Sequence, residues 1–133
     1  MNPTTGQLLI AVGVIHNLFG LAAGLIQAPG TNRKLFTEII NMGVFNSIDP
    51  DPMRMALFWF IWFGWAIILC GMGMHHLERT TKTLPQAMLL GLVALCIGGC
   101  VMMPISGFWI ALGVAAHGTW RYARSNNTRV APS

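Results

Sequence analysis

A histidine and an asparagine lie side by side within an otherwise apolar stretch, "GVIHNLFG", residues 13–20. On a helix, steps of three and four residues place His16 and Asn17 on the same face as Gly13 and Gly20. A glycine-rich face packs against neighbouring helices, and polar groups on it find partners or form a site. Two interpretations stay open, an interhelical hydrogen bond and an interior site that contacts a ligand.

Two sets of side chains could ligate a metal. His16 and His117 would supply two axial imidazoles for a haem, as facing helices of bundles do. The segment "CGMGMHH" combines soft sulfur with imidazole, which suits Cu(I); its candidate ligands are Cys70, Met72, Met74, His75 and His76. Their spacing spreads them around a helix, and methionine also fills gaps in apolar cores. We predict no cofactor, with haem or copper as the alternative.

Aromatic side chains surround the segment "FWFIWFGW", residues 58–65. This pattern is typical of a lipid-facing surface, and it could also form one wall of a pocket for a flat lipophilic ligand. The candidate ligand-binding residues are His16, Asn17, Arg54, Trp59, Trp62, Ser106 and His117. No nucleophile with an adjacent base is recognisable, so no catalytic residue is predicted.

The composition is that of a membrane protein. Of the 133 residues, 54% are hydrophobic and 9% are charged, whereas a soluble domain has about 25% charged residues. The apolar segments predict four transmembrane helices, at about residues 6–28, 53–76, 84–103 and 105–122. We therefore expect an all-α, polytopic bundle over residues 1–122, followed by a disordered polar tail over residues 123–133.

The first loop, residues 29–52, is too polar to cross a membrane. Its apolar residues recur at helical spacing between Leu35 and Val44, which predicts an amphipathic helix in the membrane interface. The alternative is a lid over the outer mouth of the bundle. No Asp, Glu, Lys or Arg lies inside a predicted span, which argues against ion-coupled transporters and proton pumps.

Basic residues predict the orientation. Five of them fall on the side of the second loop and the tail: Arg79, Lys82, Arg121, Arg124 and Arg129. The first loop and the start of the second helix hold three, so both termini are expected in the cytoplasm. Because these cations are spread over loops and tail, the expected partners are lipid headgroups and not nucleic acid.

Small residues indicate close helix packing. Gly20 and Gly24 form a small-xxx-small pattern, for which a homo-oligomer is the alternative to packing within one chain. The cysteines Cys70, Cys96 and Cys100 lie in apolar runs and do not form a disulfide framework.

Three stretches of the sequence are similar to those of a known protein family. They are the histidine and glycines of the first helix, "FNSIDPDPMRMALFWFIWFGW" and "MPISGFWI". They resemble a family of small bacterial integral membrane proteins known only as a domain of unknown function. The likeness covers about residues 6–120 and is strongest at "DPMRMALFWF" and "MPISGFW". It implies four spans in a bacterial cytoplasmic membrane. It does not indicate any particular activity. The layout is distantly similar to the DoxX-like four-helix membrane proteins, a likeness of fold alone.

Together these patterns predict a non-enzymatic protein embedded in the inner membrane. Its interior would bind a small lipophilic ligand, or its surface would engage a membrane partner. A haem- or copper-binding redox protein is the alternative. A third interpretation, an enzyme acting on a lipid or isoprenoid-like substrate, is disfavoured by the lack of carboxylates inside the spans.

Overall fold

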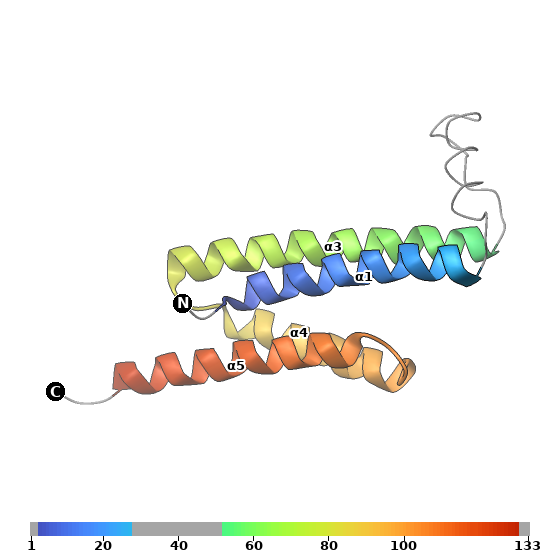
Figure 1. Cartoon of the computed structure of the whole chain (residues 1–133). Helices are drawn as coiled ribbons and strands as arrows, with labels where there is room; N and C mark the ends of the chain where they lie inside the picture. Colours follow the sequence, from blue (N-terminus) through green and yellow to red (C-terminus); the bar gives the residue numbers. More distant parts are fainter. Residues whose placement is uncertain (1–2, 28–51, 131–133) are drawn as a thin grey trace. The chain divides into compact units, whose positions relative to one another are not determined.

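The structure, a computed structural model, describes residues 3–27 and 52–130. This part of the chain forms four helices: α1 (Thr5–Gln27), α3 (Pro52–Thr81), α4 (Gln86–Met102) and α5 (Phe108–Val130) (Figure 1). The predicted all-α class is confirmed. The predicted interfacial helix of the first loop falls on residues outside the described part.

Two of the helices are long and apolar enough to cross a membrane. The candidate spans cover 18 residues of α1, Thr5–Ala22, and 27 residues of α3, Met55–Thr81. Helix α4, with 17 residues, is a shorter apolar helix. About 20 apolar residues are needed to cross the hydrocarbon core of a bilayer. Among the described helices, α1 and α3 are the two that combine sufficient length with sufficient hydropathy.

Two helices continue beyond the predicted spans. Helix α3 continues past residue 76 to Thr81, and α5 covers residues 108–130 where the sequence predicts a span over residues 105–122 and a disordered tail. The apolar pattern reports where side chains avoid water, whereas backbone hydrogen bonding continues into polar sequence. The Arg124 guanidinium, for example, lies 5.5 Å from the ring centroid of Trp120, one turn earlier on α5.

The chain divides into two compact units, which we describe separately. The terminal unit comprises Met1–Val12 and Ile67–Ser133, and the central unit comprises Gly13–Ala66.

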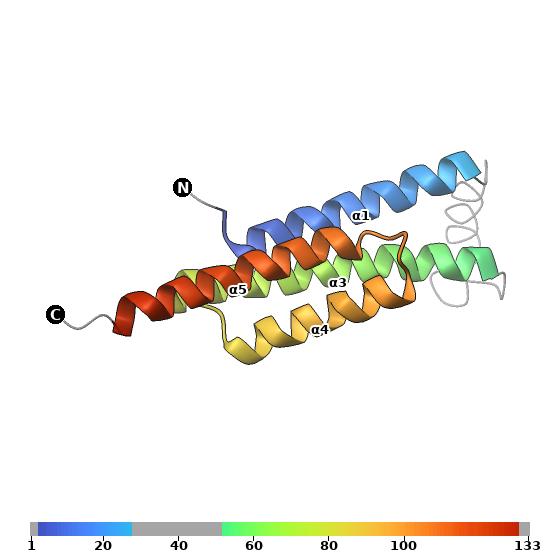
Figure 2. The same cartoon turned by 90° about the horizontal axis from the view of Figure 1, so that it is seen from below.

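In the terminal unit, α4 and α5 form a hairpin (Figure 2). Between them, Ser106 Oγ donates to the Met103 carbonyl oxygen at 2.6 Å and accepts the Phe108 amide at 3.4 Å, so this serine caps the start of α5. The core of the unit consists of Leu9, Met74, Leu84, Leu89 and Val114. These residues come from α1, α3, the α3–α4 connection, α4 and α5, so burial of their side chains holds parts of all four helices together.

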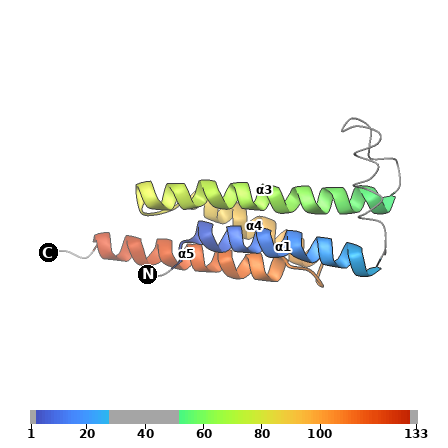
Figure 3. The same ribbon diagram turned by 45° about the horizontal axis from the view of Figure 1, so that its top comes forward.

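In the central unit, the second half of α1 packs antiparallel on the first half of α3 (Figure 3). Gly20 is buried under the Phe60 ring: a Cβ at Gly20 would lie 2.5 Å from Phe60 Cδ1. Gly64 likewise makes room for the Asn17 side chain. Small residues on both helices therefore bring the two backbones together.

Candidate functional site

The terminal unit buries the carboxylate of Glu78, whose residue is 7% exposed. Its Oε1 accepts the Thr5 amide at 3.1 Å, and its Oε2 accepts the Gly6 amide at 2.9 Å. The Arg121 Nη1 donates to Oε1 at 3.0 Å. A buried carboxylate needs such charged or amide donors to offset its lost hydration. Glu78 therefore joins the start of α1, the end of α3 and the middle of α5.

The remaining first amides of α1 are satisfied locally. Thr4 donates its backbone N–H to Gln7 Oε1 at 3.0 Å, and the Gln7 amide donates to Thr4 Oγ1 at 3.1 Å. This reciprocal pair is a capping box. With the two amides bound by Glu78, residues 4–7 all have acceptors, and the positive end of the helix dipole faces a carboxylate.

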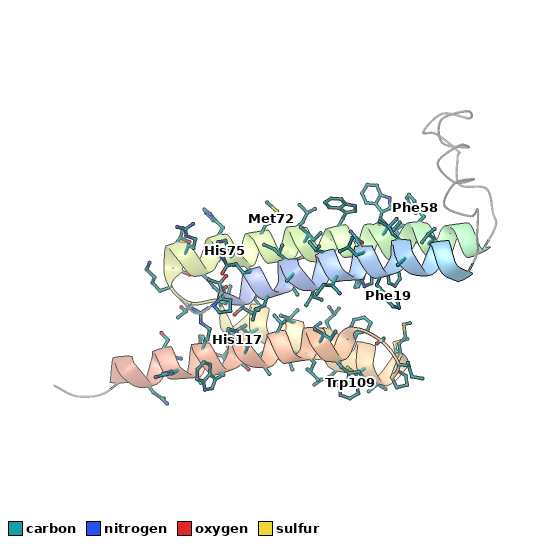
Figure 4. All side chains as sticks on the ribbon, viewed as in Figure 1. Phe19, Phe58, Met72, His75, Trp109 and His117 are labelled. Atoms are coloured by element: carbon teal, nitrogen blue, oxygen red, sulfur yellow. The ribbon has the colours of Figure 1, made fainter. Side chains whose placement is uncertain are left out.

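The backbones of α1 and α3 approach closely beside Glu78. A Cβ at Gly6 would lie 2.5 Å from the Gly71 carbonyl oxygen and 2.6 Å from His75 Cα. Thr4 Oγ1 lies 2.7 Å from His75 Nδ1. Figure 4 shows His75 on α3 and His117 on α5, with their side chains drawn as sticks. Only a residue without a side chain fits at position 6.

A cavity of about 110 Å³ adjoins this ion pair within the terminal unit. Its lining residues are Glu78, Lys82, Thr83, Leu84, Gly118, Arg121, Tyr122 and Ser125. The lining brings two cations, one carboxylate and three hydroxyl groups around one small space. Lys82 has a positive φ of 68°, in the left-handed region, which costs a lysine roughly 1 kcal/mol or more.

His16, the leading candidate from the sequence, contacts α3 in the central unit. Its Nε2 donates to the Phe60 carbonyl oxygen at 3.0 Å. Its ring stacks on the Phe60 ring, with centroids 3.8 Å apart and planes 10° apart, and meets Phe63 edge-on at 5.8 Å. Asn17 Oδ1 is buried, with no partner among the described residues. This histidine thus fastens α1 to α3.

The other predicted ligand residues are divided between the units. Trp59 and Trp62, 64% and 56% exposed, lie in the central unit with Arg54, whose side chain is outside the described part. Ser106 and His117 belong to the terminal unit, where Ser106 caps α5. His117 Nδ1 is buried and has no partner among the described residues.

The predicted metal ligands of α3 face different directions. Cys70, Met72 and His76 are exposed, whereas Met74 is in the core and His75 contacts Thr4. In residues 3–27 and 52–130, no group of three or more His, Cys, Asp or Glu side chains could hold a metal ion.

Glu78 and its ion pair were missed by reasoning from the sequence, because the second span was ended before it. A signal was present: Gly71, Met74 and Glu78 follow each other at steps of three and four, which places Glu78 on the buried face of α3. The pattern Thr4-x-x-Gln7 also announces a helix start whose amides need acceptors.

Comparison with known proteins identifies a family and no activity. No curated protein and no solved structure matches the chain. One family model, described as "Family of unknown function (DUF6463)", matches residues 1–125 and so includes every residue of the Glu78 cluster and its cavity. The chain therefore belongs to the DUF6463 family, a family of unknown function.

Proposed function

We propose that the protein is an integral membrane protein of a bacterial inner membrane, which binds a small lipophilic ligand without transforming it. In this proposal all four helices cross the membrane, with both termini in the cytoplasm. The candidate spans in α1 and α3 support the membrane location, and the excess of cations near the second loop and the tail supports the orientation.

The observation that carries the proposal is the apolar exterior of the helices. Large apolar side chains are exposed on all four of them, for example Phe19 at 67%, Leu69 at 66%, Val101 at 77% and Trp109 at 57%. Figure 4 shows Phe19 pointing away from α3. So much exposed apolar surface is unfavourable in water and is expected against lipid.

The aromatic cluster of the central unit supports a lipophilic ligand. Phe58 contacts Trp59 at 5.6 Å and Trp62 at 5.7 Å between ring centroids, and both tryptophans remain exposed. Flat, polarizable rings of this kind pack well on an extended apolar molecule. Gly20, the candidate oligomer contact, is already covered by Phe60 of the same chain, which favours a ligand over a second copy.

Mass spectrometry of molecules that co-purify with the protein tests the proposal. We expect one lipophilic species to be enriched over the bulk membrane lipids, and to fall at least fivefold in the double variant Trp59→Leu, Trp62→Leu. Trp109→Leu is the matched control, because Trp109 is exposed to a similar extent on α5. If the unmodified protein, the double variant and Trp109→Leu all co-purify with lipids in the proportions of the bulk membrane, ligand binding would be contradicted. Release of the chain from membranes by alkaline carbonate would contradict the membrane location itself.

A further inference from the structure

The cavity beside Glu78 has the chemistry of an anion site. Its cations are Lys82 and Arg121, and its carboxylate, Glu78, already accepts two amides and one guanidinium group. Glu78 is thus paired with Arg121. The ammonium group of Lys82 donates to the Arg79 carbonyl oxygen at 3.3 Å and forms no ion pair within residues 3–27 and 52–130. The space is therefore positive overall, with hydroxyl donors from Thr83, Tyr122 and Ser125.

We propose that this cavity binds a phosphate group, and that the phosphate belongs to the headgroup of an anionic membrane lipid. Phosphate oxygens accept hydrogen bonds from guanidinium, ammonium and hydroxyl groups, which are the groups that line the cavity. Water occupies about 30 Å³ per molecule in the liquid, so a cavity of about 110 Å³ has room for a tetrahedral anion.

Residues around the cavity are those found at the level of lipid headgroups. Trp120 packs under the Arg124 guanidinium at 5.5 Å, and the Tyr122 hydroxyl lies 3.5 Å from Gln86 Oε1. Tryptophan, tyrosine and arginine gather where helices leave the hydrocarbon, and basic residues there attract anionic lipids. This inference rests on the proposed membrane location, which places the end of α3 at that level.

Two residues at the cavity, Thr5 beside it and Lys82 in its lining, have distinctive local environments. Thr5 is fully buried, its Oγ1 has no partner among the described residues, and it lies 3.2 Å from where a Cβ on Gly118 would be. Gly118 lines the cavity. Lys82 directly follows Thr81, the last residue of α3, and its left-handed conformation is one in which helices commonly end.

The test measures lipid binding to the full chain in detergent by native mass spectrometry. Phosphatidylglycerol and diacylglycerol are titrated separately; the two share acyl chains, and only the first carries phosphate. We expect phosphatidylglycerol to bind at least fivefold more tightly than diacylglycerol. Lys82→Asn should remove most of this difference, because asparagine tolerates a positive φ and carries no charge.

Arg124→Gln is the matched control. It removes one positive charge at the same end of the unit, from a residue outside the cavity lining, and should change phosphatidylglycerol binding less than twofold.

Inorganic phosphate, added at millimolar concentration to the protein with bound phosphatidylglycerol, is a competition experiment. Displacement of the lipid would confirm a phosphate site. Tighter binding of the free ion than of the lipid would assign the site to soluble phosphate and not to a lipid headgroup. Equal loss in Lys82→Asn and Arg124→Gln, or equal binding of the two lipids, would overturn the proposal. Neither result affects the alkaline carbonate test of membrane location. Failure of the phosphate site can therefore be distinguished from failure of the proposed membrane location.

Discussion

The carboxylate of Glu78 and the guanidinium of Arg121 form an ion pair at 3.0 Å, and the same carboxylate accepts the first two amides of α1. Arg121 also donates to the Pro3 carbonyl oxygen at 3.3 Å. The segment before α1, the end of α3 and the middle of α5 therefore meet at one group. In a protein with few charged residues, this cluster fixes how the helix ends of the terminal unit are joined.

Replacing Glu78 with glutamine should destabilise the protein by about 3 kcal/mol, the lower end of the range for breaking a buried pair. The lower end applies because the Arg121 side chain is 33% exposed and water takes over part of its interaction. Glutamine also turns an NH2 group toward a backbone N–H, which leaves that donor unpaired. Unfolding in detergent, followed by circular dichroism, measures the change. Arg79→Gln, an exposed neighbour on α3, should change stability by less than about 0.5 kcal/mol.

Arg121→Gln should cost less than Glu78→Gln, about 1 to 3 kcal/mol. Without the guanidinium, the carboxylate still accepts two amides. In Glu78→Gln, one of these amides faces an NH2 group and the guanidinium loses its negatively charged partner. The same unfolding assay ranks the two variants. A larger loss for Arg121→Gln would show that the guanidinium, and not the carboxylate, organises the cluster.

Gly6→Ala should destabilise by about 1 to 3 kcal/mol, the cost of overpacking a closed contact. The added Cβ would lie within 2.5 to 2.6 Å of α3 backbone atoms of Gly71 and His75, which cannot move as a side chain end can. Gly73→Ala is the matched control, since nothing lies within 4 Å of its Cβ position. That variant should gain about 0.5 to 1 kcal/mol from helix propensity. Equal effects of the two substitutions would disprove the close approach of α1 and α3.

His16→Phe separates structural from ligand-binding roles of the histidine. The phenyl ring keeps the stack on Phe60 but loses the hydrogen bond to its carbonyl oxygen. We expect a loss of about 0.6 to 1.7 kcal/mol, the range for polar contacts between membrane helices. His16→Ala should lose about 0.5 to 1.5 kcal/mol more, because the ring contact also disappears. Unchanged stability in His16→Phe, together with loss of the co-purifying lipophilic species, would show that the histidine contacts the ligand.

Much of the architecture was predictable from sequence because it depends on local patterns. Proline and glycine mark the ends of the apolar segments. The spacing of glycines in the first helix indicates the packed face on which His16 and Asn17 lie. The Glu78 cluster was not found, because its partners are 43 and 72 to 73 residues away along the chain. A polar residue just past an apolar run resembles a solvated helix end until the tertiary partners are known. For the same reason, the sequence predicts a last span that ends at Tyr122, whereas α5 continues to Val130.

In the proposed topology, the helices cross a membrane with the Glu78 end of the terminal unit on the cytoplasmic side. Single cysteines tested with a membrane-impermeant maleimide, in a chain whose native cysteines are replaced, measure this directly. Suitable exposed positions are Thr80→Cys and Asn126→Cys near that end, and Ile105→Cys in the α4–α5 connection. We expect Thr80→Cys and Asn126→Cys to react only from the cytoplasmic side, and Ile105→Cys only from the opposite side. Labelling of all three from one side of sealed vesicles would contradict it.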